Sequence, residues 1–238
     1  MSLPTPAQLA PAIAALFPAG VVVADLREPG NPDLLLPGEG EHLARAAPKR
    51  VREFAAGRTC ARRAMAELGI APEALKVGQG RQPLWPSGFT GSITHTDDYC
   101  AAAVAPRTIA GALGIDTEIV GDVKADLWPS ICTRAEMDRL EALPQRWRAI
   151  GATLIFSAKE AFYKSQYPLT GEFLGFHDVE VEGWHDPQDL ECLDGGGMGE
   201  SFVRPTRSIA FERHAAAPFR ARHRVIGRHL ICGIATLA

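Results

Sequence analysis

The stretch IAGALGIDTEIV, residues 109–120, is an apolar run that two carboxylates interrupt. A run of this kind predicts a strand that is buried on both faces, except where the carboxylates emerge. Residues two apart on a strand project from the same face, roughly 6.5–7 Å apart along the chain. We therefore expect Asp116 and Glu118 to point together, and we expect Gly114 to leave room there for a ligand.

A second charged stretch, FSAKEAFYK, covers residues 156–164. Offsets of three and four residues overlay on a helix, so Glu160 and Lys164 share one face, while Ala158 and Phe162 fall on a face suited to the core. We expect this helix to run from about residue 145 to 166 and to stop before Pro168. The pattern brings three acids and a lysine near the middle of the chain.

The rest of the chain alternates between strand and helix signals. A helical pattern from Gly40 to Leu68 is split at Pro48 and capped by Gly69, and TRAE at 133–136 is a capping box that opens another helix. Strands are expected at 20–26, 91–95, 100–105, 176–182 and near 202–211, with a closing hairpin around Gly227. This order indicates a two-lobed α+β protein.

The length and composition of the chain limit which functions it can have. The chain has 238 residues, 46% of them hydrophobic, and a net charge of −3, which fits one large or two small folded domains without a general attraction to nucleic acid or membrane. The first 20 residues carry four prolines and no basic start, so we interpret them as packing structure rather than a signal peptide. The five cysteines form no pattern of zinc ligands, which favours reduced thiols in a cytoplasmic protein.

The charged residues allow two interpretations. Carboxylate oxygens of Asp116, Glu118 and Glu160 suit Mg²⁺, which takes its remaining ligands from water and substrate phosphate, and Lys164 adds a positive charge for a phosphate or leaving group. That combination predicts metal-assisted phosphoryl chemistry. The other interpretation is a solvated i,i+4 ion pair on a helix and a chance pair of acids on a strand. Residue spacing leaves both open.

Five sequence blocks, in order, resemble one family. GIDTE and FSAKEAFYK match the two hallmark motifs of the phosphopantetheinyl transferases, and EFAAGRTCARRAMAELG, GRQPLWPSG and GSITHTDDYCAAAVA are similar to blocks of the large pseudo-dimeric, surfactin-type class, especially its siderophore-associated branch related to the enterobactin-pathway enzyme. The resemblance covers about half of the chain, from Arg50 to Leu169. It implies two similar α/β lobes related by a pseudo-twofold axis, residues 1–112 and 113–238, with coenzyme A held between them.

The resemblance also implies an activity. It is the transfer of 4′-phosphopantetheine from coenzyme A to a serine of an acyl or peptidyl carrier protein, with release of adenosine 3′,5′-bisphosphate. Mg²⁺ would be bound by Asp116, Glu118 and Glu160. Glu160 would also be the base for the carrier serine, and Lys164 would neutralise or protonate the departing phosphate. The metal site, the catalytic helix and carrier docking are assigned to residues 113–238.

The coenzyme A contacts are assigned mainly to residues 1–112. His95, in the SITH block, matches a histidine that contacts the 3′-phosphate. The further positions that the resemblance gives for coenzyme A are Arg50, Arg58, Ser92 and Thr94, with Lys76 or Arg81 as another cation and Lys159 facing either the phosphates or solvent. Arg62 and Arg63 are interpreted as a solvated helix face.

The final third of the chain is rich in arginine. Residues 204–238 hold Arg204, Arg207, Arg213, Arg220, Arg222, Arg224 and Arg228, against the single acid Glu212 in that range. They would either guard exposed strands or dock an acidic carrier protein. Gln166, Tyr167 and Leu169 would add apolar contacts to the carrier.

Two other functions fit the same residues. One is a Mg²⁺-dependent nucleotide phosphohydrolase with water as the acceptor. The other is a carrier-binding module without activity, against which the intact acids and lysine argue. We expect a cytoplasmic monomer with coenzyme A and carrier protein as partners, without nucleic acid or membrane.

Overall fold

The structure is a computed structural model that describes residues 9–207 and 219–236. It divides into two compact units at Leu113 and Gly114, one residue from the predicted boundary. We call them the N-terminal unit and the C-terminal unit. None of the helices in the described part of the chain combines the length and apolar character that a membrane span requires.

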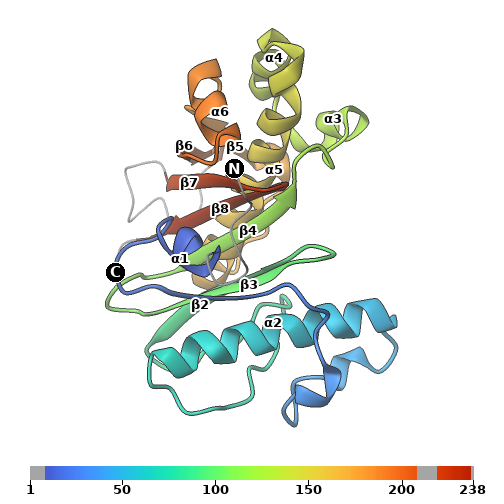
Figure 1. The fold of residues 1–238 in the computed structure, drawn as a ribbon, viewed down its shortest axis with the longest axis vertical. Helices are drawn as coiled ribbons and strands as arrows, with labels where there is room; N and C mark the ends of the chain where they lie inside the picture. The colour runs from blue at the N-terminus through green and yellow to red at the C-terminus, as the bar shows by residue number, and fades with distance from the viewer. Residues whose placement is uncertain (1–8, 208–218, 237–238) are drawn as a thin grey trace. The chain divides into compact units, whose positions relative to one another are not determined.

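The N-terminal unit holds an antiparallel three-stranded sheet in the order β1-β3-β2. Its strands are β1 (Val22–Leu26), β2 (Phe89–His95) and β3 (Cys100–Pro106), and its helices are α1 (Leu9–Ala14), η2 (Pro32–Leu34), η3 (Glu41–Leu43) and α2 (Pro48–Glu67). Figure 1 shows α2 lying along this sheet. The three strands predicted from the sequence are confirmed.

Helix α2 is defined by its ends and by small residues. Pro48 occupies the first turn, where its missing N–H is not needed, and Gly69 adopts a left-handed φ of 76° just after the helix. Ala56, Cys60 and Ala61 are buried against the sheet, so the helix can approach it closely. The predicted helical pattern before Pro48 is wrong over most of its length, because only the short turn η3 forms there.

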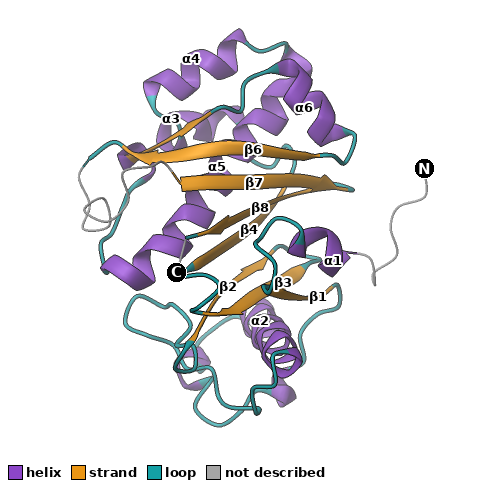
Figure 2. Cartoon of the chain, turned by 90° about the vertical axis from the view of Figure 1, so that its left-hand side faces the viewer, coloured by secondary structure: helices purple, strands orange, loops and turns teal. Residues whose placement is uncertain are grey.

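The C-terminal unit holds a five-stranded sheet in the order β4-β8-β7-β6-β5. Its strands are β4 (Leu113–Ile119), β5 (Val179–Glu182), β6 (Met198–Pro205), β7 (Phe219–Ile226) and β8 (His229–Ala235). Its helices are η4 (Ala125–Leu127), α3 (Trp128–Ile131), α4 (Arg134–Ala142), α5 (Gln145–Thr170), η5 (Phe176–Asp178) and α6 (Pro187–Asp194). Figure 2 shows this sheet and the helices of the same unit.

Helix α5 carries the second charged stretch and packs chiefly on β8. Its predicted core residues Ala158 and Phe162 are fully buried. The predicted end before Pro168 is wrong, since the helix continues to Thr170 and ends at Gly171, whose φ is 67°. A proline in the last turn removes only one helical hydrogen bond, so the turn can still close.

Two further predictions are confirmed, and the helices α1, α3 and α6 were missed. Thr133 and Glu136 form the capping box of α4, and Gly227 sits in the β7–β8 turn with a φ of 62°. Helix α6 was not predicted, because its short sequence lies among charged and turn residues. The mixed architecture with two sheets agrees with the predicted α+β class, whereas the twofold relation of the lobes stays a prediction. Strand residues expected at 208–211, together with Arg213 and Glu212, lie outside the described residues.

Candidate active site

Strand β4 and helix α5 bring the predicted acids and lysine of the C-terminal unit together. The Lys164 ammonium donates to Asp116 Oδ1 at 2.6 Å and to the Ile115 carbonyl at 3.2 Å. Asp116 is only 3% exposed, so this contact is shielded from water. Lys164 therefore pairs with the strand carboxylate as well as sharing a helix face with Glu160.

Gly114 sets the distance between β4 and α5. A Cβ built at Gly114 would lie 1.8 Å from the Ala161 carbonyl oxygen of α5. The glycine thus makes room for the helix backbone, whereas the sequence predicted that it makes room for a ligand. This contact fixes Asp116 next to the turn of α5 that carries Glu160 and Lys164.

The carboxylates of this group repel one another. Burial, with the negative charges of Asp116 and Glu160, raises the pKa of the Glu118 carboxyl to about 8. Burial also raises the pKa of Glu160, to which Asp116 contributes. Burial alone would lower the pKa of Lys164, but Asp116, Glu160 and Glu118 together raise it. The single lysine leaves an excess of negative charge that a cation would balance.

The donor set fits a hard cation that keeps part of its water. Asp116 Oδ2 is buried and finds no hydrogen-bond partner among the described residues. Within residues 9–207 and 219–236, no three His, Cys, Asp or Glu side chains form a ready metal cage. Mg²⁺ needs no such cage, because it is usually bound by one or two carboxylates, water and substrate phosphates.

Lys159 lies elsewhere than the sequence predicted. Its ammonium donates to the carboxylate of Glu136 at 2.7 Å and to the carbonyls of Ile131 and Phe176 at 2.9 and 2.8 Å. An ammonium has three donors, and all three are used inside the unit. The prediction that Lys159 contacts coenzyme A phosphates or solvent is therefore corrected: its side chain is 1% exposed and pairs with Glu136.

A pocket of about 170 Å³ opens beside Glu160. Its lining residues are Lys159, Glu160, Phe162, Tyr163, Phe173, Leu174, Gly175, Phe176 and Val179. Tyr163 packs edge-on against Phe173, whose ring centroid lies 5.8 Å away, and Phe173 is 75% exposed. The pocket thus offers mostly apolar walls next to a carboxylate.

A group of cations gathers in the N-terminal unit. Arg50 Nη1 lies 2.9 Å from His95 Nε2, which joins two of the predicted phosphate contacts. Arg58 is 3% exposed, donates through Nε to the Leu75 carbonyl and stacks on the Phe54 ring. Its Nη2 is buried and has no hydrogen-bond partner among the described residues. A buried guanidinium with an unused donor is suited to an anion.

His42 is a member of this group that the sequence did not reveal. Its ring packs edge-on against Phe54 at 4.9 Å. Partial burial lowers the pKa of His42, and the positive charges of Arg58, Arg50 and Arg81 lower it further. No motif marks this histidine, because it lies in the irregular segment before α2.

Of the two alternative cations, Arg81 belongs to this group. It has a φ of 64°, a left-handed conformation that is uncommon for arginine and often occurs at functional sites. The Lys76 side chain is exposed and its Cε lies near Gly38. The charge of Arg81 acts on His42, which favours Arg81 over Lys76.

Ser92 and Thr94 face away from His95. Successive side chains on a strand alternate between faces, and both residues are buried while His95 is exposed. Thr94 Oγ1 is buried without a hydrogen-bond partner in the described part of the chain. The structure therefore does not bring these two hydroxyls together with the His95 ring.

Arg62 is not part of a solvated helix face. It makes two hydrogen bonds to Glu39, at 2.8 and 2.7 Å, and a third to the Leu34 carbonyl. Glu39 is fully buried and also accepts from the backbone N–H of Leu75. This pair fastens the segment before α2 to the loop that carries Lys76 and Arg81. Arg63 is exposed, as predicted.

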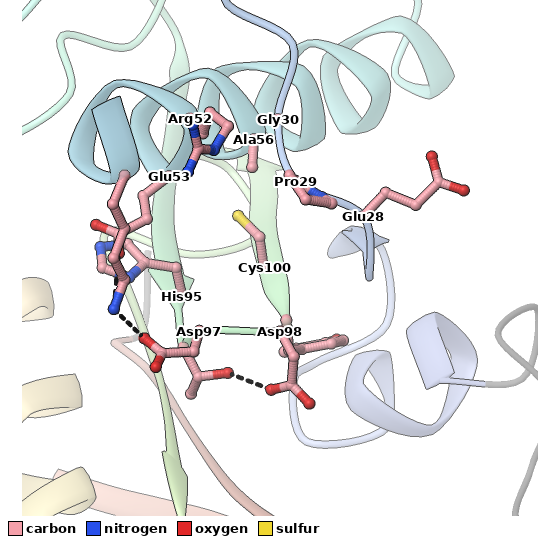
Figure 3. A pocket seen from close by; sticks show the side chains of 13 residues that line it. Glu28, Pro29, Gly30, Arg52, Glu53, Ala56, His95, Asp97, Asp98 and Cys100 are labelled. Carbon is pink, nitrogen blue, oxygen red and sulfur yellow. Dashed lines mark hydrogen bonds and ion pairs between the residues drawn. The ribbon is translucent and has the colours of Figure 1, made fainter. Parts of the chain in front are cut away.

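A second pocket, of about 300 Å³, lies beside α2 (Figure 3). Arg52 and Glu53 line it from the helix, His95 lines it from the end of β2, and Asp97 and Asp98 line it from the β2–β3 turn. Lys49 closes its rim by an ion pair with Asp97 at 2.6 Å. Its four acids, Glu28, Glu53, Asp97 and Asp98, outnumber its basic residues Lys49, Arg52 and His95, so this pocket is less suited to phosphate than the group around Arg58.

The arginines of the final third are largely paired. Glu200 on β6 binds Arg222 at 3.0 Å and Arg220 at 3.8 Å, and Glu182 on β5 binds Arg204 at 3.5 Å. Arg207 pairs with Glu172 and Asp178, and Arg224 donates to the Gly196 carbonyl. These cross-strand pairs favour the interpretation of a charged outer sheet face over that of a free basic surface.

A group of cations in one unit, and carboxylates with a lysine in the other, are typical of a protein that handles a phosphorylated ligand. Family models described as "4'-phosphopantetheinyl transferase N-terminal domain" and "4'-phosphopantetheinyl transferase superfamily" match residues 39–105 and 112–217. The chain belongs to the 4′-phosphopantetheinyl transferase superfamily, which confirms the family predicted from the sequence.

Curated relatives agree. The chain is 41% identical over 173 residues to 4′-phosphopantetheinyl transferase Svp of Streptomyces mobaraensis, covering 71% of this chain and 70% of the relative. It is 37% identical over 169 residues to 4′-phosphopantetheinyl transferase Npt of Nocardia iowensis, covering 71% and 75%. It is 34% identical over 158 residues to enterobactin synthase component D of Escherichia coli (strain K12), covering 66% and 73%.

Proposed function

We propose that this chain transfers 4′-phosphopantetheine from coenzyme A to a serine hydroxyl of an apo acyl or peptidyl carrier protein, in a Mg²⁺-dependent reaction that releases adenosine 3′,5′-bisphosphate. The observation that carries the proposal is the convergence of Asp116, Glu118, Glu160 and Lys164 where β4 meets α5. Membership of the superfamily supports the same reaction. The protein acts as a cytoplasmic monomer.

Coenzyme A is recognised through its phosphates and its pantetheine arm. The unused Nη2 of Arg58, with Arg50, His95, Arg81 and His42, supports binding of the nucleotide phosphates by the N-terminal unit. The pocket beside Glu160 has mostly apolar walls, which supports binding of the pantetheine arm there.

Asp116, Glu118 and Glu160 would hold the Mg²⁺ ion, which would supply positive charge to neutralise the pyrophosphate oxygens. Glu160 accepts the proton of the carrier serine, directly or through one water. The serine oxygen forms a bond to the pantetheine-bearing phosphorus, and the bond from that phosphorus to the bridging oxygen breaks. Lys164 stabilises the negative charge on the departing bisphosphate.

The proposal is tested by intact-mass spectrometry. The protein is incubated with coenzyme A, Mg²⁺ and several apo carrier proteins, and a carrier that gains one phosphopantetheine supports transfer. Release of phosphate without that gain would indicate the phosphohydrolase instead, and binding of carrier with neither product would indicate a non-catalytic module.

A variant tests the role of the base. Glu160→Ala is expected to abolish transfer while binding of adenosine 3′,5′-bisphosphate largely survives, and Glu141→Gln, an exposed change on α4, serves as the control. Normal turnover in Glu160→Ala would show that another group takes the proton.

A further inference from the structure

The buried ammonium of Lys159 holds the wall of the pocket beside Glu160. The wall includes Phe173 to Phe176, and the Phe176 carbonyl accepts a hydrogen bond from Lys159 at 2.8 Å. The residues from Gly171 to Gly175 lie in neither a helix nor a strand, so their position depends on such contacts. Loss of the ammonium would free the wall at the point where it meets α5.

Glu136 completes this arrangement from α4. One carboxylate oxygen accepts from Lys159 and from the backbone N–H of Thr133, each at 2.7 Å, and the other accepts from the backbone N–H of Val181 at 2.7 Å. Glu136 is fully buried. A buried charge that loses its partner is strongly destabilising, so the two side chains depend on each other.

The pair connects four segments around the pocket. Lys159 lies in α5 and binds the carbonyl of Phe176. Glu136 lies in the first turn of α4 and binds the backbone N–H of Val181 in the edge strand β5. Lys159 directly precedes Glu160 in α5, and both residues line the same pocket. The pair therefore sets the distance between the pocket wall and the helix turn that carries Glu160.

We propose that Lys159 and Glu136 are a positioning pair: they hold the wall at Phe176 against α5, so that the pantetheine arm places its phosphorus at Glu160. This inference rests on the proposed transfer reaction. Neither side chain is free to touch the substrate, because the three donors of Lys159 are used inside the unit and the Glu136 side chain is fully buried.

Kinetics of three variants test the pair. Lys159→Met and Glu136→Gln are each expected to lower kcat/KM for coenzyme A by about 10- to 100-fold, through kcat as well as KM, since a misplacement of the reacting phosphorus by about 1 Å has effects of this size on the rate. The kcat/KM of the double variant is expected to be no lower than that of the more impaired single variant, because both changes remove the same interaction. Affinity for adenosine 3′,5′-bisphosphate, which lacks the arm, should stay within about twofold.

The control is Glu141→Gln, on the exposed side of the same helix as Glu136. All rates are measured well below the melting temperature of each variant. A single variant leaves one buried charge unpaired, which can prevent it from folding. In that case the double variant, which leaves no buried charge unpaired, is used for the test. It should then bind coenzyme A weakly and adenosine 3′,5′-bisphosphate normally.

Several results would overturn the inference. A loss in Lys159→Met with unchanged kinetics in Glu136→Gln would mean that Lys159 acts on the ligand directly. Normal coenzyme A kinetics in the double variant, with only the melting temperature lowered, would mean that the pair serves folding alone. Absence of transfer by the unaltered protein would instead refute the proposed function, and the inference with it.

Discussion

Substitution of Gly114 by alanine should separate the two halves of the catalytic group without changing any charged residue. The new Cβ would lie 1.8 Å from the Ala161 carbonyl oxygen, whereas Cβ contacts under 3.0 Å are essentially never seen. The obstacle is helix backbone rather than a flexible side chain. Strand β4 must therefore move away from α5 by about 1.2 Å, the difference between these two distances.

The size of the effect follows from this displacement. Overpacking of a buried contact destabilises a protein by about 1–3 kcal/mol. The same movement would stretch the 2.6 Å contact between Lys164 and Asp116. A misplacement of about 1 Å can lower a rate by about 100-fold, so we expect a larger loss in kcat than the loss of stability alone would cause.

Denaturant unfolding and steady-state transfer to a carrier protein are the two assays. Gly195→Ala is the matched control, since a Cβ there meets its nearest atoms at an ordinary 3.5 Å and φ is −73°. Affinity for adenosine 3′,5′-bisphosphate should survive in both variants. Wild-type turnover and stability in Gly114→Ala would refute the idea that this glycine sets the spacing of the site.

Three other predictions concern charge and pH. Arg58→Gln should weaken binding of adenosine 3′,5′-bisphosphate by about 10- to 100-fold, which is what the loss of a charge-assisted hydrogen bond costs. The control Arg63→Gln changes an exposed arginine and should leave the affinity unchanged. The affinities are measured by calorimetry, and equal affinities of the two variants would exclude Arg58 from the site. Burial lowers the pKa of His223 to about 3, so the folded state binds fewer protons than the unfolded state between that value and the ordinary 6.5. About 3 kcal/mol of stability should therefore be lost at pH 4. In chemical denaturation the stability of His223→Gln should depend less on pH, and an unchanged pH profile would contradict this. The pKa of Glu118, about 8, means that the metal-free folded state holds an extra proton between about pH 4.5 and 8, so its stability should fall as pH rises through that window. Added Mg²⁺ should therefore raise the melting temperature more at pH 8 than at pH 6. An equal rise at both pH values would contradict this.

Much of the fold could be predicted because its signals are local. Apolar runs mark the strands, and the capping box at Thr133 is complete within four residues. Pro168 misled the prediction for the end of α5, since a proline in a last turn interrupts less than one in a helix interior. Helix α6 has eight residues, too few for a clear periodic signal.

The site was only partly predictable because side-chain partners are set by tertiary contacts. The spacing of Glu160 and Lys164 indicates a shared helix face, but nothing in it indicates that Lys164 reaches Asp116. Lys159 and Glu160 are neighbours in the sequence, yet one ammonium is buried against Glu136 while the carboxylate beside it lines a pocket. His42 has no motif, and only its packing on Phe54 relates it to the arginines.

The burial of Arg58 has a consequence for how the protein responds to ionic strength. Salt at physiological concentration screens charges beyond about 8 Å, and it acts mainly on exposed groups such as Arg50 and Arg81. The guanidinium of Arg58 is 3% exposed and is screened much less. Attraction of an anionic nucleotide from a distance will therefore weaken as salt is added, while the hold on a phosphate already bound at Arg58 persists. Salt should slow the association of coenzyme A much more than it speeds its release.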